Sequence, residues 1–243
     1  MNSYYLLLDL AAIAGPIALS FDKRVRYFEK WRFALLSCLI TAIPFIIWDM
    51  VFTENAVWGF NKDYLIGISV HNLPLEEVLF FIVVPFSCIF IYECCRYYIP
   101  IKGSKTVDLI VSVILLSICV LSIIGNPDGF YSLISSLVGV ATIIFWKINR
   151  RISHLGYTFL FSLIPFIIMN GALTGLFTSK PVVWYNDLET IGFRLLTIPI
   201  HDVVYGMSLI FITLFIYHRL FSSRLNHQSN DIPSDLNDSQ GNI

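Results

Sequence analysis

Long apolar runs alternate with short polar segments along most of this chain. Seven of the runs are close to the roughly 20 residues that a helix needs to cross a bilayer. They lie at 4–21, 33–52, 76–95, 107–125, 130–148, 156–176 and 200–221. The pattern predicts an all-α integral membrane protein with seven transmembrane helices. The polar segment 225–243, which is rich in Asn, Ser and Asp, predicts a disordered cytoplasmic tail.

Two parts of the chain resemble each other when they are aligned about 125 residues apart. The similar segments are 43–49 with 164–170, 58–61 with 184–187, and 73–78 with 198–203. Each part holds three of the expected helices, the first within 1–106 and the second within 130–224. A direct repeat of three helices would be inverted in the membrane, so the extra helix within 107–129 restores the orientation. We therefore expect two parallel three-helix repeats, joined by a linking transmembrane helix and related by a pseudo-twofold axis along the membrane normal.

The basic residues predict how the bundle is oriented. Of the 16 Lys and Arg residues, 13 fall on one side of the predicted helices, and the other side holds only Lys62, Lys180 and Arg194. Because basic loops stay in the cytoplasm, we expect the N-terminus outside and the C-terminus in the cytoplasm, in a bacterial inner membrane. Residues 1–4 lack the basic region of a signal peptide, so we expect the first apolar run to stay in the protein.

The composition excludes several classes of function. Hydrophobic residues make up 56% of the chain, charged residues 14%, and the formal net charge is −1, so no basic footprint for a nucleic-acid partner is present. The five cysteines show no zinc-site spacing. The last predicted helix has no lysine for a retinal Schiff base, and the chain has no Gly-rich phosphate loop. We expect the lipid bilayer as the surrounding medium, and neither a cofactor nor a metal.

Four titratable residues occupy matching places in the two repeats. Glu76 and Glu77 follow Pro74, and His201 and Asp202 follow Pro199. Ionisable groups in membrane helices are costly and usually functional, although acids in the first turn of a helix are also favoured by its dipole. Because adjacent residues point about 100° apart on a helix, we expect only one of the two glutamates to face a cavity.

Other polar and aromatic residues are weaker candidates. Asp49 and Asn170 correspond in the repeat and either line the same cavity or mark the outer ends of two helices. Phe80 and Phe81, one turn below the acids, either face a bound hydrocarbon or belong to the core. We expect Asp9 to hydrogen-bond a neighbouring helix. The same reasoning leaves Glu93 solvated at the cytoplasmic end of its helix, and places Trp58 and Trp184 in an interfacial aromatic belt.

The segment Pro74-Leu75-Glu76-Glu77, followed by an aromatic and apolar helix that ends in Tyr92-Glu93, resembles the signature of the lycopene cyclase domain. The segment 198–202, with Tyr205 and Tyr217, resembles the partner domain of the same enzymes. The resemblance covers residues 1–221 in a fused two-domain arrangement. One position departs from the family pattern, because His201 stands where the partner domain usually has the first of two acids.

This resemblance implies a membrane-embedded lycopene cyclase of carotenoid biosynthesis, an intramolecular lyase or isomerase. A carboxylic acid protonates the terminal double bond of lycopene or a related acyclic carotenoid, a six-membered ring closes, and a base removes a ring proton. We expect a beta-type ring and no cofactor. The implied catalytic residues are Glu76, Glu77, Asp202 and His201, and the implied substrate contacts are Asp49, Asn170, Phe80, Phe81 and Tyr205.

Two other functions are compatible with the same pattern. A carotenoid hydratase, or another isoprenoid-modifying enzyme on this scaffold, would let water quench the cation. A small membrane transporter also uses parallel repeats and acids within the bilayer, but it would need a polar stripe through several helices. A homo-oligomer and contacts with other carotenoid enzymes are open alternatives for the partners.

Overall fold

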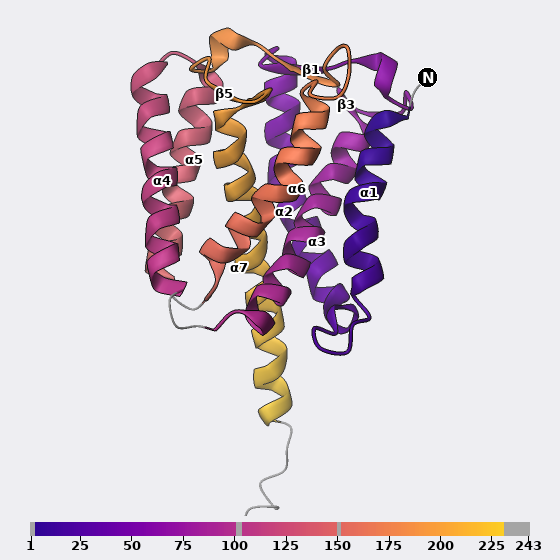
Figure 1. Ribbon diagram of the computed structural model, residues 1–243, viewed down its shortest axis with the longest axis vertical. Coiled ribbons are helices and arrows are strands. Elements are labelled where there is room, and N and C mark those ends of the chain that lie inside the picture. The colour runs from indigo at the N-terminus through magenta and orange to yellow at the C-terminus, as the bar shows by residue number, and fades with distance from the viewer. Residues whose placement is uncertain (1–2, 101–103, 150–151, 231–243) are drawn as a thin grey trace, which may run out of the picture.

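Seven long α-helices form a bundle in the computed structural model, which describes residues 3–100, 104–149 and 152–230 (Figure 1). In chain order these helices are α1 (Tyr4–Leu19), α2 (Trp31–Glu54), α3 (Leu75–Tyr98), α4 (Ser104–Gly125), α5 (Phe130–Ile148), α6 (Leu155–Leu173) and α7 (Ile200–Asn230). The prediction of seven helices is confirmed, and most helix ends fall within a few residues of the apolar runs.

Six of these seven helices are long and apolar enough to cross a membrane. The exception is α1, which has 16 residues and is therefore roughly 24 Å long, at about 1.5 Å per residue. A bilayer core is about 30 Å thick. The expected span 4–21 is two residues longer than the helix, which ends at Leu19, and the hydroxyl of the next residue, Ser20, bonds the carbonyl of Pro16 at 2.5 Å. The structure thus supports six candidate crossings where the apolar pattern predicted seven.

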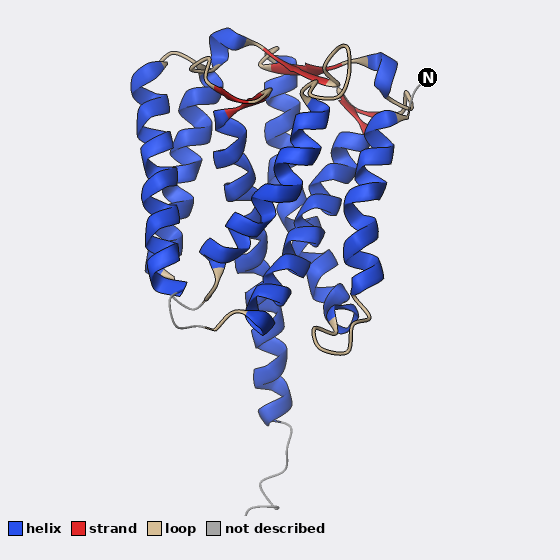
Figure 2. Cartoon of the chain, in the orientation of Figure 1, coloured by secondary structure: helices blue, strands red, loops and turns tan. Residues whose placement is uncertain are grey.

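Short strands and 3-10 turns cap one end of the bundle, a feature that the apolar pattern did not predict (Figure 2). The strands are β1 (Trp58–Phe60), β2 (Ser69–Val70), β3 (Leu73–Pro74), β4 (Val183–Tyr185), β5 (Arg194–Leu195) and β6 (Ile198–Pro199). The 3-10 turns are η1 (Tyr27–Lys30), at the opposite end, with η2 (Lys62–Tyr64) and η3 (Asp187–Glu189) in the capping loops. Antiparallel pairing of β1 with β4 joins the α2–α3 loop to the α6–α7 loop.

The two capping loops contain the same local elements in the same order. Asn61 accepts a hydrogen bond from the backbone at the start of η2, and Asn186 does the same at η3. Further along, His71 and Leu196 adopt left-handed backbone angles, with φ of 57° and 59°, between the strands of the hairpins β2–β3 and β5–β6. When the two loops are aligned on these matching residues, Trp184 corresponds to Gly59. The sequence comparison instead matches Trp184 with Trp58, one residue away.

Each hairpin ends in a proline that leads directly into a helix. Pro74 has φ −65° and an extended ψ of 149°, and it precedes the first residue of α3. Pro199 closes β6 immediately before α7. Since proline lacks the N–H that a first turn leaves unbonded, it starts a helix at little cost. Glu76, Glu77 and Asp202 therefore fall in first turns, where the helix dipole favours negative charge.

The opposite end of the bundle is held by ion pairs around Glu93. This side chain is only 3% exposed, and it pairs with Lys30 at 2.5 Å and Arg96 at 3.2 Å. Tyr217 of α7 donates a further hydrogen bond to it at 2.8 Å. The expectation of a solvated Glu93 is therefore wrong, because a carboxylate can be buried when cations and donors surround it.

The predicted C-terminal tail overlaps the last helix. In Figure 1, α7 extends beyond the other helices at the end away from the N-terminus. It ends at Asn230, inside the segment 225–243 that was expected to be disordered. The rest of that segment lies outside the described residues, as do Lys102, Arg150 and Arg151.

Candidate functional site

A cavity of about 310 Å³ lies among α1, α3, α6 and α7, beneath the paired strands β1 and β4. Helices from both parts of the chain line it, whereas no lining residue comes from α4. On α3 the lining residues Glu77, Phe80, Val84, Ser87 and Ile91 recur every three or four positions, so they form one face of that helix. The wall is mainly apolar and aromatic, and its polar groups gather near the strands.

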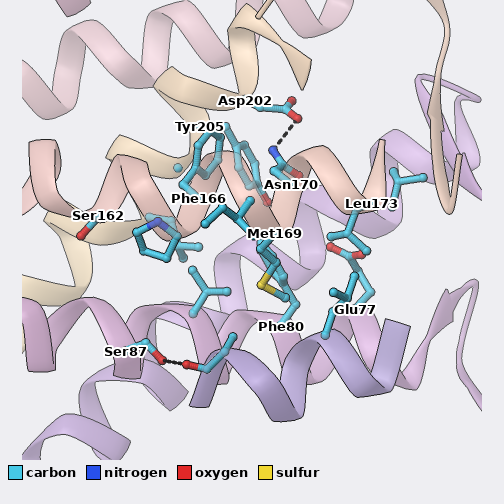
Figure 3. A pocket seen from close by; sticks show the side chains of 18 of the residues that line it. Glu77, Phe80, Ser87, Ser162, Phe166, Met169, Asn170, Leu173, Asp202 and Tyr205 are labelled. Atoms are coloured by element: carbon cyan, nitrogen blue, oxygen red, sulfur yellow. Dashed lines mark hydrogen bonds between the residues drawn. The ribbon is translucent and has the colours of Figure 1, made fainter. Parts of the chain in front are cut away.

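Two carboxyl groups from different parts of the chain face this cavity. Glu77 of α3 and Asp202 of α7 both line it. Figure 3 shows Glu77, Asn170 and Asp202 toward one end of the cavity and Ser87 and Ser162 toward the other. The expectation that one glutamate of the pair faces a cavity agrees with this geometry.

Each of these carboxyl groups accepts a hydrogen bond from a tyrosine that lies two helices earlier in the chain. Tyr5 of α1 donates its hydroxyl to Glu77 at 2.7 Å. Tyr131 of α5 donates to Asp202 at 2.5 Å. The two tyrosines stand at corresponding places before their acids, so the same pair occurs once in each part of the chain.

Asp202 has a richer set of donors than Glu77. Besides Tyr131, it accepts hydrogen bonds from Tyr185 of β4 at 2.8 Å and from the amide of Asn170 on α6 at 3.0 Å. Hydrogen bonds donated to a carboxylate stabilise its charged form, so three donors favour ionised Asp202 more than a single donor favours ionised Glu77.

Tyr185, in the capping loop, stays protonated as such a donor. Its burial, the negative charge of Asp202 and the hydrogen bond to Asp202 raise the pKa of Tyr185 well above its ordinary value. The charges of Glu77 and Asp49 add to this effect. The phenol therefore lies within electrostatic reach of three carboxyl groups from α2, α3 and α7.

Asp49 of α2 completes the polar end of the cavity. The indole N–H of Trp58 donates to one of its carboxylate oxygens, and the other, Oδ2, is buried without a partner among the described residues. The hydroxyl of Tyr205 is also buried and unpaired within the described chain. Both residues line the cavity, so they leave an acceptor and a hydroxyl available there.

Glu76 and His201, the neighbours of the two cavity acids, do not line the cavity. Glu76 is fully buried, and its Oε1 accepts a hydrogen bond of 2.7 Å from the backbone N–H of Ile66 in the capping loop. His201 lies 2.9 Å from the hydroxyl of Ser132 through its Nε2 atom. The angle of about 100° between consecutive residues turns both side chains away from the cavity. The structure therefore places both side chains off the cavity wall, and their catalytic role stays a prediction.

Of the remaining candidates from the sequence, some line the cavity and one, Phe81, does not. Phe80 and Tyr205 line the cavity beside Asp49 and Asn170, and their contact with a substrate stays a prediction. Phe81 points elsewhere, into a small core cluster with Phe45 of α2, where the ring centroids are 6.3 Å apart.

Asp9 and Trp58 contradict their expected roles. Asp9 is 1% exposed, and neither carboxyl oxygen has a hydrogen-bond partner in the described part of the chain, so it does not bond a neighbouring helix. Trp58 is buried and packs on Tyr131 with ring centroids 5.1 Å apart, away from any interfacial belt. Trp184 is 42% exposed, which fits its expected interfacial position.

Among the residues that donate hydrogen bonds to the cavity acids, the sequence reasoning missed four, namely Tyr5, Trp58, Tyr131 and Tyr185. The matching placement of Tyr5 and Tyr131 before their acids was a detectable signal. Among the described residues, no group of three or more His, Cys, Asp or Glu side chains is arranged to hold a metal ion. What the arrangement offers is three carboxyl groups with unequal hydrogen bonding, those of Asp49, Glu77 and Asp202, beside an apolar, aromatic chamber.

Comparison with known proteins points to one family. The family model for lycopene cyclases matches residues 2–95 and 128–220. The unmatched stretch between these segments contains α4, the helix that contributes nothing to the cavity. No solved structure matches the chain.

Curated relatives carry the same enzyme name but are much longer. A bifunctional lycopene cyclase/phytoene synthase of Aspergillus oryzae is 22% identical over 152 residues, which is 57% of this chain and 24% of the relative. Proteins of the same name from Arthroderma gypseum and Leptosphaeria maculans are 31% and 30% identical over 58 and 63 residues, 24% and 26% of this chain. The matched segments span only 10% of each of these two relatives.

Proposed function

This chain belongs to the lycopene cyclase family, and we propose that it is a membrane-embedded enzyme that closes the end groups of lycopene into ionone rings. The observation that carries the proposal is the joint cavity, in which Glu77 and Asp202 from the two parts of the chain face an apolar, aromatic chamber. The reaction needs one acid and one base next to a hydrocarbon, and this chamber supplies both.

Glu77 is the proposed proton donor. With a single hydrogen bond from Tyr5, its carboxylate is less stabilised than that of Asp202, so Glu77 is the one of the two that keeps a proton and can supply it to the terminal double bond of the substrate. The protonated double bond becomes a tertiary cation, and the neighbouring double bond attacks it to close a six-membered ring.

Asp202 is the proposed proton acceptor. Its three hydrogen bonds favour the charged form, which stabilises the cation and then takes the ring proton. One proton is added and one is lost, so the product has the mass of the substrate and no electrons are exchanged. Net transfer of one proton from Asp202 back to Glu77 completes the cycle.

Aromatic rings protect and stabilise the cation in this scheme. Tyr205 and Trp58 line the cavity with their ring centroids 6.2 Å apart, and Phe80 lies on the same wall. Aromatic faces attract cations, most strongly where water is excluded. Asn170 and Asp49 border the same chamber. The amide of Asn170 orients Asp202 through a hydrogen bond, and Asp49 orients the indole ring of Trp58 in the same way.

We extend the proposal to the arrangement in the membrane. The helices α1–α3 and α5–α7 form two parallel repeats linked by α4, with the strands on the outside and the C-terminus in the cytoplasm. The matching loop elements, the matching Tyr–acid pairs and the gap in the family match at α4 support this arrangement. The relatives named above are fungal, and they do not support the expected bacterial inner membrane.

The test is expression in a bacterial host that accumulates lycopene. The proposal predicts a cyclic carotenoid of unchanged mass, with beta-type rings, identified by pigment chromatography and mass spectrometry. A hydroxylated product would assign the scaffold to a hydratase instead. Unaltered lycopene in cells that contain the folded protein in the membrane would overturn the proposed activity.

A further inference from the structure

The cavity is elongated along the bundle. Its wall on α3 runs from Glu77 to Ile91, fourteen residues apart and thus roughly 21 Å along the helix axis. Below the polar end, the lining consists mostly of apolar side chains such as Val84, Leu209 and Ile210. At about 310 Å³, the volume lies at the lower end of small-molecule pockets, which range from about 300 to 1,000 Å³. A narrow chamber of this size takes one end of a long hydrocarbon and leaves the rest outside.

Three residues on the cavity wall are also exposed on the outer surface of the bundle. They are Ala11 of α1 with Pro165 and Ile168 of α6, and Ile168 is 58% exposed. The other described residues of the wall are buried or half-buried. Because α1 packs mainly on α3 and touches α6 at few positions, the wall is interrupted between α1 and α6. These three residues border what we name the lateral opening.

The positions of these residues on their helices agree with an opening at this place. Ala11 lies beside the inward-facing stripe Tyr5, Leu8 and Ala12 of α1, at the edge of that helix face. It follows Tyr5 by six residues, so it lies about 9 Å below the Tyr5–Glu77 pair along the helix. The opening therefore leads to the polar end of the cavity from the side.

The surface around the lateral opening is apolar. Leu7 and Leu10 on α1 and Phe161 and Ile164 on α6 are exposed beside it. Of these two helices α6 is a candidate membrane span, and α1 is a shorter apolar helix beside it. Their shared apolar surface faces hydrocarbon, since it would be costly to leave in water. Molecules that reach the opening come from the bilayer, and they must be apolar themselves.

We propose that the lateral opening bordered by Ala11, Pro165 and Ile168 is the passage through which an acyclic carotenoid enters the cavity from the bilayer. Its end group reaches Glu77 and Asp202, while its polyene chain occupies the opening between α1 and α6. This inference rests on the proposed cyclase function. It adds where the substrate passes, and it accounts for the three exposed residues on a wall whose other described residues are buried or half-buried.

The test blocks the opening after the protein has folded. Ile168→Cys is labelled in reconstituted membranes with a bulky, membrane-soluble maleimide, and cyclisation of lycopene is measured before and after labelling. The matched control is Ile164→Cys, which is on the same exposed face of α6 at 61% exposure but does not line the cavity. Labelled wild-type protein measures any effect on its five native cysteines, and mass spectrometry gives the labelled fraction.

Labelling at position 168 is expected to lower kcat/KM by about tenfold or more, with no such change in the control or the wild type. A fully labelled Ile168→Cys protein that cyclises lycopene at its unlabelled rate overturns the passage, provided that the wild type is active. If wild-type protein makes no cyclic product at all, the proposed function itself fails. Ala11→Trp and its neighbour Leu10→Trp, exposed but off the wall, repeat the comparison from the α1 side, with loss of activity expected only for the former.

Discussion

The hydroxyl of Tyr5 on α1 donates a hydrogen bond of 2.7 Å to Oε2 of Glu77 on α3. Tyr131 on α5 makes the corresponding bond to Asp202 on α7, at 2.5 Å. The two pairs differ in what surrounds them, because Asp202 accepts from Tyr185 and Asn170 as well. A chain with two similar parts thus presents two unequal acids to one cavity, and unequal acids are what a reaction with separate proton donor and acceptor requires.

The first prediction separates the two neighbouring glutamates. Glu77→Gln removes the proposed transferable proton, and we expect cyclisation to fall by about 10²-fold or more, the usual scale of general acid catalysis. Glu76→Gln is the matched control, since the amide oxygen still accepts the hydrogen bond from Ile66 and the side chain lies off the cavity. Its rate should stay near that of the wild type. Product formation per amount of folded membrane protein checks both variants, and full activity of Glu77→Gln would refute the assignment of the donor.

The second prediction concerns Tyr185 and pH. Tyr185→Phe removes one of three donors to Asp202, so we expect a moderate loss of activity, smaller than that of Glu77→Gln. Because burial and Asp202 raise the pKa of Tyr185 above its ordinary value of about 10, its deprotonation should not limit the wild type between about pH 6 and pH 9. Rate profiles of both proteins across this range test the point. An alkaline loss of activity in the wild type that disappears in Tyr185→Phe would contradict it.

Much of the architecture was predictable from local sequence. The helix positions follow from apolar runs, and the prolines at 74 and 199 mark the starts of α3 and α7. The matching acids were visible because a repeat at constant spacing compares the chain with itself. The sequence also predicted that only one of Glu76 and Glu77 faces the cavity. It did not predict which one, because the rotation of α3 about its axis depends on how that helix packs against its neighbours.

Long-range contacts set the limit of that reasoning. Trp58 looked interfacial because it lies in a loop, yet β1 pairs with β4, more than a hundred residues away, and this pairing turns Trp58 inward. The same pairing brings Tyr185 to Asp202. Glu93 looked solvated because its basic partner Lys30 is distant in sequence. Each of these errors arose where a partner from another segment, invisible in a local pattern, decides the environment of a residue.

The third prediction tests whether His201 acts as an acid or base. His201 lies off the cavity wall and contacts Ser132 at 2.9 Å, so His201→Gln, which can keep that hydrogen bond, should leave cyclisation largely intact. His201→Glu restores the residue usual at this place in the partner domain, and no gain in rate is expected from it. Loss of activity by about 10²-fold in His201→Gln, in protein of normal thermal stability, would place His201 in the catalytic machinery after all.

The last prediction concerns the unpaired carboxyl of Asp9. Both of its oxygens are buried without a hydrogen-bond partner in the described chain, and a buried polar group left unpaired costs about 1–3 kcal/mol. Replacing it by a side chain of similar size without polar atoms removes that cost, so Asp9→Leu should unfold at a temperature equal to or above that of the wild type. Ser87→Ala is the contrasting change, because it removes a hydroxyl that bonds the carbonyl of Ala12 at 3.1 Å, and it should lower the unfolding temperature slightly. Thermal unfolding in detergent, read alongside the rate of cyclisation, distinguishes the cases. If Asp9→Leu is as stable as expected but has lost its activity, then Asp9 is retained for proton transfer near Glu77, and its unpaired state is the cost of that role.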